Sequence, residues 1–340
     1  MARPATRQPL SEDRDVRRKM LAILRVLSGI EEPLGARAIG RELEKLGIEL
    51  SERQVRYHLQ FMDERGLTEA VGNAGRVLTE LGRHELDAAQ VAEKVGFVAA
   101  RIDRLAYTTT FDLETGEGDV ILNASLMSAE DLPDALECAR VVMDADLCMS
   151  HLAVVVEEGE RLGEVLVPEG MVAVGTVCSV TLNGVLLHHY IPVNSVYGGL
   201  LQLRDGHPLR FVELVSYAGS SIDPLHIFIA SGLTSSWEAA TEGAGMVGAG
   251  FREIPAAALD DALELIERMK ELGLGGVLAV GAPGQPLLDI PVGMDRVGLV
   301  VIGGLTPMAA ASERGIEIDQ HAMSTTCDYA SLKPIEELIQ

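Results

Sequence analysis

The first eighty residues carry three amphipathic helical patterns in succession, and this order restricts the fold more than any other feature of the chain. The third pattern has the clearest start, because Ser51 and Gln54 have the spacing of a capping box at a helix N-terminus. Gly47 breaks the chain just before it. The first two patterns each place apolar residues on one stripe: Val16, Met20, Ile23, Leu24 and Leu27, then Ile39, Leu43 and Leu46. The sequence therefore predicts helix, helix, turn, helix.

A predicted β-hairpin follows the third helix. Two short alternating runs, residues 67–71 and 76–79, are joined by the Gly-bounded segment 72–75, which suits a tight turn. Three helices followed by such a hairpin are typical of a winged helix-turn-helix domain. We expect this domain to span residues 12–82.

The polar face of the third predicted helix has the chemistry of a DNA-reading surface. Arginine and glutamine pair with base edges in the major groove, each good contact adding roughly 1–3 kcal/mol of discrimination. The wing would touch a phosphate or the minor groove. His58 is expected on the buried side of the helix. The alternative is a winged helix used only for protein docking. The predicted DNA-contacting residues are Arg37, Arg53, Gln54, Arg56, Tyr57, Gln60, Asn73 and Arg76.

The charge of the chain is divided unevenly. Residues 1–84 hold 15 Lys and Arg against 13 Asp and Glu, whereas residues 85–340 hold 13 against 38. A strongly acidic body is repelled by a phosphate backbone. Affinity for nucleic acid is therefore expected only in the small N-terminal part.

The cysteines and the apolar runs predict a cytoplasmic protein. Cys138, Cys148, Cys178 and Cys327 are widely spaced and follow no secretory leader, so free thiols in a reducing compartment are expected. The longest apolar run, residues 297–311, is interrupted by glycine and proline, and no membrane span is expected.

The remainder of the chain is predicted to be rich in sheet. A linker helix is expected within residues 83–104, with its helical pattern running from about Gln90, and a regulatory domain over residues 105–330. The overall class is α+β, a winged helix followed by an internally duplicated α/β domain. Predicted strands are residues 105–111, 119–126, 151–156, 171–181, 185–191, 198–203 and 209–217, and predicted helices are residues 129–143 and 256–272.

Two pieces of the acidic body repeat. Residues 132–137 (LPDALE) recur as residues 259–264 (LDDALE), and residues 191–200 share the Ile-Pro-Val and Gly-Leu pattern of residues 290–299. This similarity indicates a duplication into halves of about residues 105–215 and 216–330. Chance similarity between Gly-rich strands is the alternative. Two packed halves would leave a cleft, where small ligands usually bind.

Other motifs do not support an enzyme. Residues 243–248 match G-x-G-x-x-G but lead into a predicted strand, so the strand-turn-helix context of a dinucleotide site is missing. His188 and His189 are neighbours on a predicted strand and would point to opposite faces, which disfavours a shared metal ion. No nucleophile-elbow pattern marks a catalytic triad. No cofactor and no metal are expected.

Small and hydroxyl side chains gather at two predicted strand ends, residues 175–179 and 191–200. Such segments let amides and hydroxyls meet an anionic ligand, although packed strands and turns would have the same composition. The candidate effector-binding residues are Thr176, Cys178, Ser179, Asn194, Tyr197, Gly198 and Gly199.

At these segments the chain resembles the NrpR family of nitrogen-responsive repressors. The matching stretches are residues 175–180, 191–194 with 197–199, 210–213 with 221–225, and 252–255. The resemblance implies a dimeric repressor whose operator affinity falls when 2-oxoglutarate occupies the regulatory domain. This chain has room for one regulatory domain, whereas better-known members carry two in tandem.

The resulting hypothesis is a cytoplasmic homodimer that binds a palindromic operator through two winged helices. The regulatory body would bind a dicarboxylate through a cation, with Arg204, Arg210, Arg252 or a histidine as candidates. Residues 85–104 would transmit the change in conformation. The alternatives are a metabolite-converting enzyme with an appended winged helix, and a regulator that senses another ligand or a partner protein.

Overall fold

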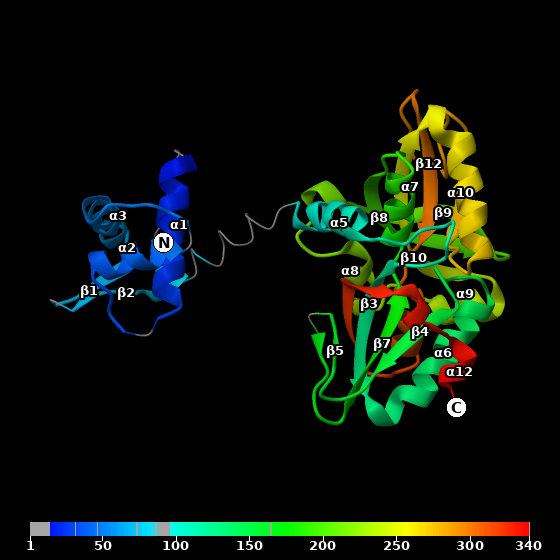
Figure 1. The fold of residues 1–340 in the computed structure, drawn as a ribbon, viewed down its shortest axis with the longest axis horizontal. Helices are drawn as coiled ribbons and strands as arrows, with labels where there is room; N and C mark the ends of the chain where they lie inside the picture. Colours follow the sequence, from blue (N-terminus) through cyan, green and yellow to red (C-terminus); the bar gives the residue numbers. More distant parts are fainter. Residues whose placement is uncertain are drawn as a thin grey trace, which may run out of the picture. The chain divides into compact units, whose positions relative to one another are not determined.

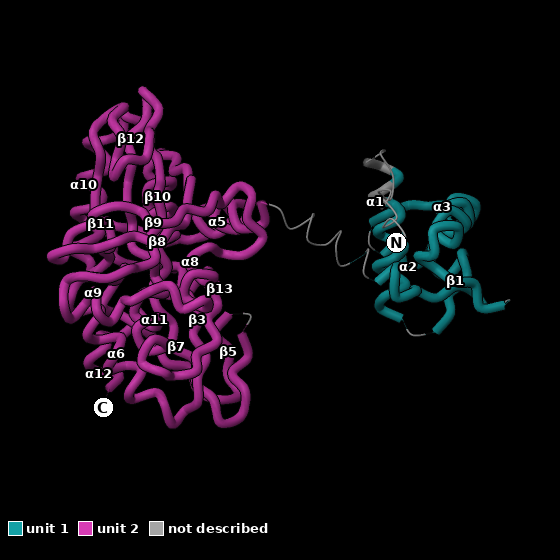
Figure 2. The backbone as a smooth tube through the Cα atoms, turned by 180° about the vertical axis from the view of Figure 1, so that it is seen from behind, with its two compact units in different colours: residues 1–94 teal, residues 95–340 magenta. Residues whose placement is uncertain are grey.

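The computed structural model of the chain forms two compact units, residues 1–94 and 95–340, which Figure 2 shows in different colours. The described residues are 14–30, 32–45, 47–72, 74–83, 86, 96–163 and 165–339.

The first unit is a winged helix, as the sequence predicts. Its described residues form α1 (Arg14–Ser28), α2 (Ala36–Lys45) and α3 (Glu52–Glu64), followed by the antiparallel hairpin of β1 (Thr68–Val71) and β2 (Gly75–Leu78) (Figure 1). The helices bury their apolar stripes against one another, because each stripe is too apolar to remain in water. The buried core includes Met20, Ile23, Leu24, Ile39, Leu43, Val55, Leu59 and Met62.

Two details of this unit bear on the sequence predictions. His58 is buried, as expected from its side of α3. Leu46, which was assigned to the second apolar stripe, lies outside the described residues.

The capping box at the start of α3 is confirmed. The Ser51 hydroxyl accepts a hydrogen bond from the backbone amide of Gln54, and the backbone amide of Ser51 donates to Gln54 Oε1 at 2.9 Å. Replacing Ser51 by Ala should lower the stability of the first unit by about 1 kcal/mol, the usual cost of losing an N-cap. Circular dichroism of the full chain would measure this change, with Ser51→Thr as the control. Fluorescence of the single tryptophan, Trp237, reports on the second unit and should not change.

The described residues of the second unit contain two five-stranded antiparallel sheets. The first sheet has the spatial order β13 (Asp319–Asp328), β3 (Asp119–Ser128), β7 (Met171–Val177), β4 (Leu152–Val156) and β14 (Lys333–Pro334). The second has the order β11 (Val277–Val280), β12 (Arg296–Ile302), β10 (Gly245–Pro255), β8 (Asn194–Arg204) and β9 (His207–Ser216). A short hairpin of β5 (Arg161–Leu162) and β6 (Val165–Leu166) lies between β4 and β7 in the sequence.

Helices cover the sheets (Figure 1). The helix α6 (Leu132–Asp144) and α11 (Thr306–Glu313) pack on the first sheet, and α7 (Val180–His188) and α10 (Leu259–Glu271) pack on the second. The other described helices of the unit are α5 (Phe97–Thr108), α8 (Pro224–Ala230), α9 (Ser236–Glu242) and α12 (Ile335–Leu338). Single 3₁₀ turns are η1 (Ala129–Asp131), η2 (Tyr217–Gly219), η3 (Ala256–Ala258) and η4 (Tyr329–Ser331).

The same order of elements occurs twice in this unit. From β3 to β8 the chain forms, in order, a strand, a 3₁₀ turn, a helix, two strands, a helix and a strand, if the inserted β5–β6 hairpin is left out. The same series runs from β10 to β13. The final helix and strand of each run cross to the other sheet, since β8 pairs with β10 and β13 pairs with β3. The two crossings pass through the β7–α7 and β12–α11 junctions.

The sequence repeats relate to this order in different ways. Residues 132–137 and 259–264 begin α6 and α10, which are equivalent elements. Residues 191–200 lead into β8, whereas residues 290–299 lead into β12, and these two strands are not equivalent. The second repeat is therefore a similarity between Gly-rich strands, and duplication of the domain stays a prediction that rests on the first.

Three predicted strands are wrong in whole or in part. Residues 185–191, read as a strand, form the second half of α7 and its C-terminal turn, and residues 105–108 belong to α5. The strand predicted for residues 171–181 ends at Val177. The helix α7 is buried on every side from Val180 to Leu186, so it has no polar stripe, and an apolar run without helical periodicity resembles a buried strand.

The predicted linker helix is described only in part. Residues 84–85 and 87–95 lie outside the described residues, and residues 97–104 belong to α5 of the second unit.

Candidate functional site

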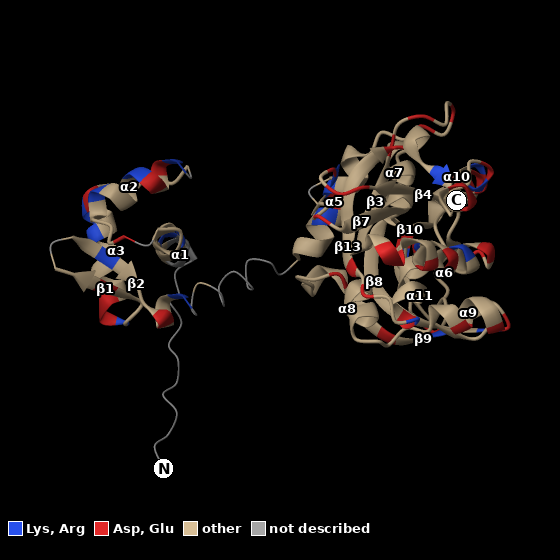
Figure 3. Ribbon diagram, turned by 90° about the horizontal axis from the view of Figure 1, so that it is seen from below, with Lys and Arg blue, Asp and Glu red and all other residues tan. Residues whose placement is uncertain are grey.

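The N-terminal part of α3 presents a polar, solvent-exposed face. Arg53, Gln54, Arg56, Tyr57 and Gln60 are all exposed, and Tyr57 keeps 67% of its accessible surface. Figure 3, a ribbon coloured by residue type, marks both basic and acidic residues on the helices of this unit. The Arg56 guanidinium pairs with Glu52 on the same helix. Such an exposed pair is weak enough to exchange for a phosphate or a base.

The remaining predicted DNA contacts differ in their surroundings, and Gln54 has a second role. Arg37 is exposed near the start of α2. Arg76 donates from Nε to Asp63 Oδ2 at 2.8 Å, which ties the wing to α3 and occupies part of its guanidinium. Gln54 serves the capping box. Asn73 lies outside the described residues.

The predicted effector residues do not form one cluster. Asn194 is exposed at the start of β8, and Tyr197, Gly198 and Gly199 are packed within the second sheet. At Gly199 a side chain would meet the Phe211 ring, which explains the glycine by packing. The assignment of these β8 residues to the effector stays a prediction.

Cys178 and Ser179 do line a small chamber at the two crossings. Thr176 is next to it, since its hydroxyl donates to the Gly304 carbonyl at 2.8 Å. The chamber has a volume of about 20 Å³. It has room for about one water molecule in this state. We call it the inner chamber; its walls include Asn123, Cys178, Ser179, Ser195, Tyr217, Asp223, Arg252, Gly304 and Met323.

Arg252 is the main charge of the inner chamber. It lies on β10, is only 3% exposed, and donates from Nη1 and Nη2 to the carbonyl and hydroxyl of Ser179, both at 2.7 Å. Burial lowers its pKa to about 10, so it is still a cation at neutral pH. No carboxylate of the described residues forms an ion pair with it. A buried charge without a counter-ion is costly, so the chamber favours an anion.

Further groups in the inner chamber also favour an anion. The N-termini of α7 and α11 both reach it, through Ser179 and Val180 on one side and Gly304 and Leu305 on the other. The partial positive charge of a helix N-terminus attracts anions. Asn123 Nδ2 is buried, and no atom of the described residues forms a hydrogen bond with it.

Gly304 keeps this space open. A Cβ atom there would lie 2.2 Å from the Val177 carbonyl oxygen and 2.6 Å from Asn123 Nδ2. The two junctions can therefore approach closely only with glycine at this position.

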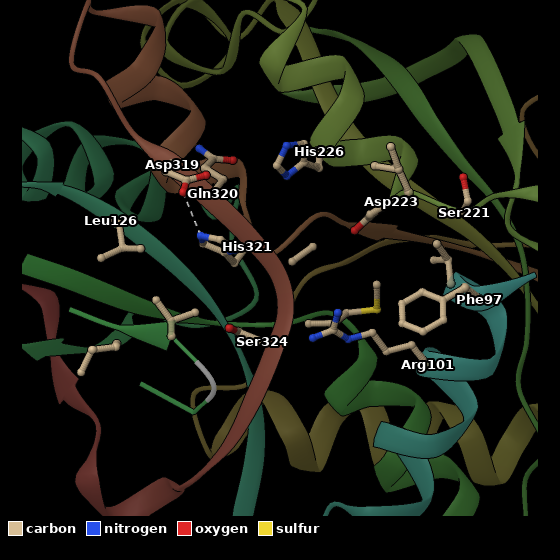
Figure 4. A pocket seen from close by; sticks show the side chains of 16 residues that line it. Phe97, Arg101, Leu126, Ser221, Asp223, His226, Asp319, Gln320, His321 and Ser324 are labelled. Atoms are coloured by element: carbon tan, nitrogen blue, oxygen red, sulfur yellow. Dashed lines mark hydrogen bonds and ion pairs between the residues drawn. The ribbon is translucent and has the colours of Figure 1, made fainter. Parts of the chain in front are cut away.

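A larger cavity of about 620 Å³ adjoins the inner chamber. Figure 4 shows its side chains, with Arg101 extending into it from α5. Arg101 Nε is buried and has no hydrogen-bond partner in the described part of the chain. The same holds for both polar atoms of the Gln320 amide, in a residue that is 5% exposed. We call this the outer cavity; it is lined among others by Phe97, Arg101, Leu166, Ser221, Asp223, His226, Asp319, Gln320, His321 and Met323.

Asp223 and Met323 line both spaces and form the wall between them. Burial raises the pKa of Asp223 to about 6, against the opposing effects of the Leu225 amide, His226 and Arg101. Met323 has a φ of 52°, in the left-handed region, within an irregular stretch of β13 between His321 and Thr325. Such backbone strain in a non-glycine residue is typical of functional sites.

The other arginines predicted to bind the effector lie away from the inner chamber. Arg204 and Arg210 are exposed, and Arg210 Nε donates to Gln202 Oε1 at 3.0 Å. Arg252 alone of the three named arginines lines the inner chamber. Four residues that line the two spaces were not among the predicted site residues: Arg101, Asn123, Tyr217 and Asp223. Asp223 lies in one of the stretches that carried the family resemblance, which was the available signal.

The structure also shows where the motifs that did not support an enzyme lie. Gly243 ends α9 and residues 245–248 begin β10, so the G-x-G-x-x-G sequence leads into a strand, as expected. His188 and His189 end α7 and do not lie on a strand, which corrects that premise. Among the helices in the described part of the chain, none is both long and apolar enough to cross a bilayer.

Comparison with known proteins extends over both units. A family model described as NrpR regulatory domains NRD1 and 2 matches residues 95–334, and one described as the ribonuclease R winged-helix domain matches residues 21–86. The global nitrogen regulator NrpRI of Methanosarcina mazei is 38% identical over 95% of this chain and 99% of its own length.

Two further relatives are longer than this chain. The global nitrogen regulators NrpR of Methanocaldococcus jannaschii and Methanococcus maripaludis are 32% and 30% identical, and the chain spans 56% and 54% of their lengths. A crystal structure of a nitrogen repressor-like protein from Methanococcus jannaschii superimposes with a TM-score of 0.59 at 27% identity, covering 69% of this chain and 97% of the other. These matches span the winged helix and the two-sheet unit alike, and the chain belongs to the NrpR family.

Proposed function

We propose that the chain is a nitrogen-responsive transcriptional repressor that binds operator DNA as a homodimer and releases it when 2-oxoglutarate binds. The exposed face of α3 and the names of the relatives support the regulatory role. The observation that carries the effector proposal is Arg252, a buried cation with no carboxylate partner among the described residues.

One carboxylate of the effector would occupy the inner chamber. There it would accept hydrogen bonds from Arg252 and Asn123 and face the N-termini of α7 and α11. The chamber is too small for the whole ligand, so the second carboxylate would extend past Asp223 and Met323 towards Arg101 in the outer cavity. A site with a cation at each end suits a dicarboxylate.

Binding would require the wall between the two spaces to move. The inner chamber holds about one water molecule in this state. The strained backbone of Met323 is the natural place for an outward shift, because a second conformation there relieves strain. Asn123 Oδ1, which accepts from the Met323 amide at 2.9 Å, links that shift to β3.

The helix α5 would carry the change towards the winged helix. Arg101 of α5 lines the outer cavity, Ile102 lines the inner chamber, and α5 packs against β13. It is also the first described helix of the second unit. A ligand that favours one position of α5 would change operator affinity by its differential affinity for the two states, typically 1–3 kcal/mol.

The pKa of Asp223 predicts how effector binding depends on pH. Neutral Asp223 does not repel an anionic ligand, so binding should tighten as the pH falls from 8 towards 6, by up to about tenfold per unit. Titration calorimetry at several pH values would measure this, and Asp223→Asn should remove most of the dependence. His226 and His321 also line the outer cavity, so His226→Gln and His321→Gln are the controls. An identical pH profile in Asp223→Asn would contradict the assignment.

The direct test of the effector is calorimetry with 2-oxoglutarate. Glutarate, which lacks the keto oxygen, and glutamate, which adds an ammonium group, are matched comparison ligands. We expect saturable binding of 2-oxoglutarate. The absence of heat at millimolar concentration would contradict the effector, and a stronger response to another ligand would replace it.

A further inference from the structure

The strand β9 forms a free edge of the second sheet. It pairs with β8 along one side, and no strand of the described residues pairs with its other side. The strand is ten residues long. Pro208 has no amide to donate, and two register shifts against β8 interrupt the strand, but the other outer amides and carbonyls of β9 are a template for another strand.

The side chains of β9 leave this edge apolar. Residues on both of its faces are exposed. Four aliphatic side chains are between 37% and 43% exposed: Leu209, Val212, Leu214 and Val215. A long, exposed and apolar edge strand indicates an interaction surface.

The charge of β9 differs from that of the body that carries it. Residues 85–340 hold 38 acidic against 13 basic side chains, whereas the strand has one arginine, Arg210, and one glutamate, Glu213. A basic partner would be drawn to the acidic surface elsewhere on the unit and gains nothing at a strand without net charge. Two copies of an acidic body can approach each other best at such a neutral strip.

We propose that β9 pairs with β9 of a second copy in antiparallel orientation, about a two-fold axis near the middle of the strand. This inference rests on the proposed homodimer and assigns its surface. Two identical edges related by a two-fold axis satisfy each other's amides and carbonyls, so the second sheets of the two chains become continuous. The same pairing brings Arg210 of one copy towards Glu213 of the other.

The test is the mass of the full chain in solution, measured by light scattering after gel filtration. The wild type should have twice the mass of one chain. Leu214→Lys places a charge in the pairing edge and should weaken dimerisation at least about tenfold. Leu263→Lys on α10 is the matched control, because Leu263 and Leu214 are both 39% exposed. Unchanged circular dichroism would show that both variants fold.

A second variant tests the two-fold axis directly. Val212→Cys should form a disulfide between two copies under mild oxidation, because the axis brings this position close to its own copy. Leu263→Cys should not. A dimer that persists in Leu214→Lys and does not cross-link through position 212 would overturn the proposal, as would a wild type that is monomeric or that pairs with another protein through β9.

The experiments distinguish an error in the proposed dimer surface from an error in the proposed regulatory function. Monomeric Leu214→Lys should bind 2-oxoglutarate with unchanged affinity, because β9 does not line either space of the effector site. Its affinity for a full operator should fall, since only one half-site is held at a time. Loss of effector binding in the wild type itself would instead contradict the proposed function.

Discussion

Arg252→Gln should lower the affinity for 2-oxoglutarate by at least about thirtyfold, since removing one partner of a buried charged pair typically costs 2–5 kcal/mol. The guanidinium is buried and already held in place by Ser179, so the bound carboxylate would lose a preorganised cation. The variant should still bind operator DNA, but 2-oxoglutarate should no longer release it. Calorimetry and a DNA-binding titration measure these two effects separately.

The matched control for this variant is Arg204→Gln. Arg204 lies on β8, next to β10 in the same sheet, but it is exposed. It should leave effector affinity unchanged. Arg252→Lys keeps the charge but loses the planar fork, and an intermediate affinity is expected. Equal losses in Arg252→Gln and Arg204→Gln, in folded protein, would contradict the assigned site.

The double variant Arg53→Ala, Arg56→Ala should lower operator affinity by at least about thirtyfold, because each good arginine contact to a base edge contributes roughly 1–3 kcal/mol. Both side chains lie near the N-terminus of α3, the part of a recognition helix that meets base edges. Fluorescence anisotropy with labelled operator would measure the loss. Binding of 2-oxoglutarate should be unchanged.

Arg65→Ala is the control variant for the winged helix. Arg65 is the C-cap of α3 and stacks on Phe61, with 4.1 Å between the guanidinium carbon and the ring centroid. It lies at the opposite end of the helix from Arg53, so operator affinity should change little. A double variant that still binds operator fully would support the alternative of a winged helix used for protein docking.

The winged helix could be predicted from sequence because its signals are local. The apolar stripes of α1 and α2 and the capping box at Ser51 each lie within a few residues of one another, and the structure confirms them. The helix α7 was missed because its surroundings are apolar on all sides, which removes the helical period. Only tertiary packing distinguishes such a helix from a buried strand.

The site was harder to predict, because its parts meet only through long-range crossings. Asn123 of β3, Arg252 of β10 and Gly304 after β12 are more than fifty residues apart in sequence, yet all line the inner chamber. Composition pointed equally to Ser179 and Gly199. Ser179 lines the inner chamber, whereas Gly199 packs against Phe211. The sequence offered three candidate arginines, and only burial separates Arg252 from the others.

Effector binding and operator binding should oppose each other in one chain. The most direct measurement is the affinity of the full chain for operator DNA across a titration of 2-oxoglutarate, with calorimetry of the effector in the presence and absence of DNA. Saturating effector should weaken operator binding by about 5- to 150-fold, and DNA should weaken effector binding by the same factor. An operator affinity that does not change while 2-oxoglutarate binds would contradict this coupling.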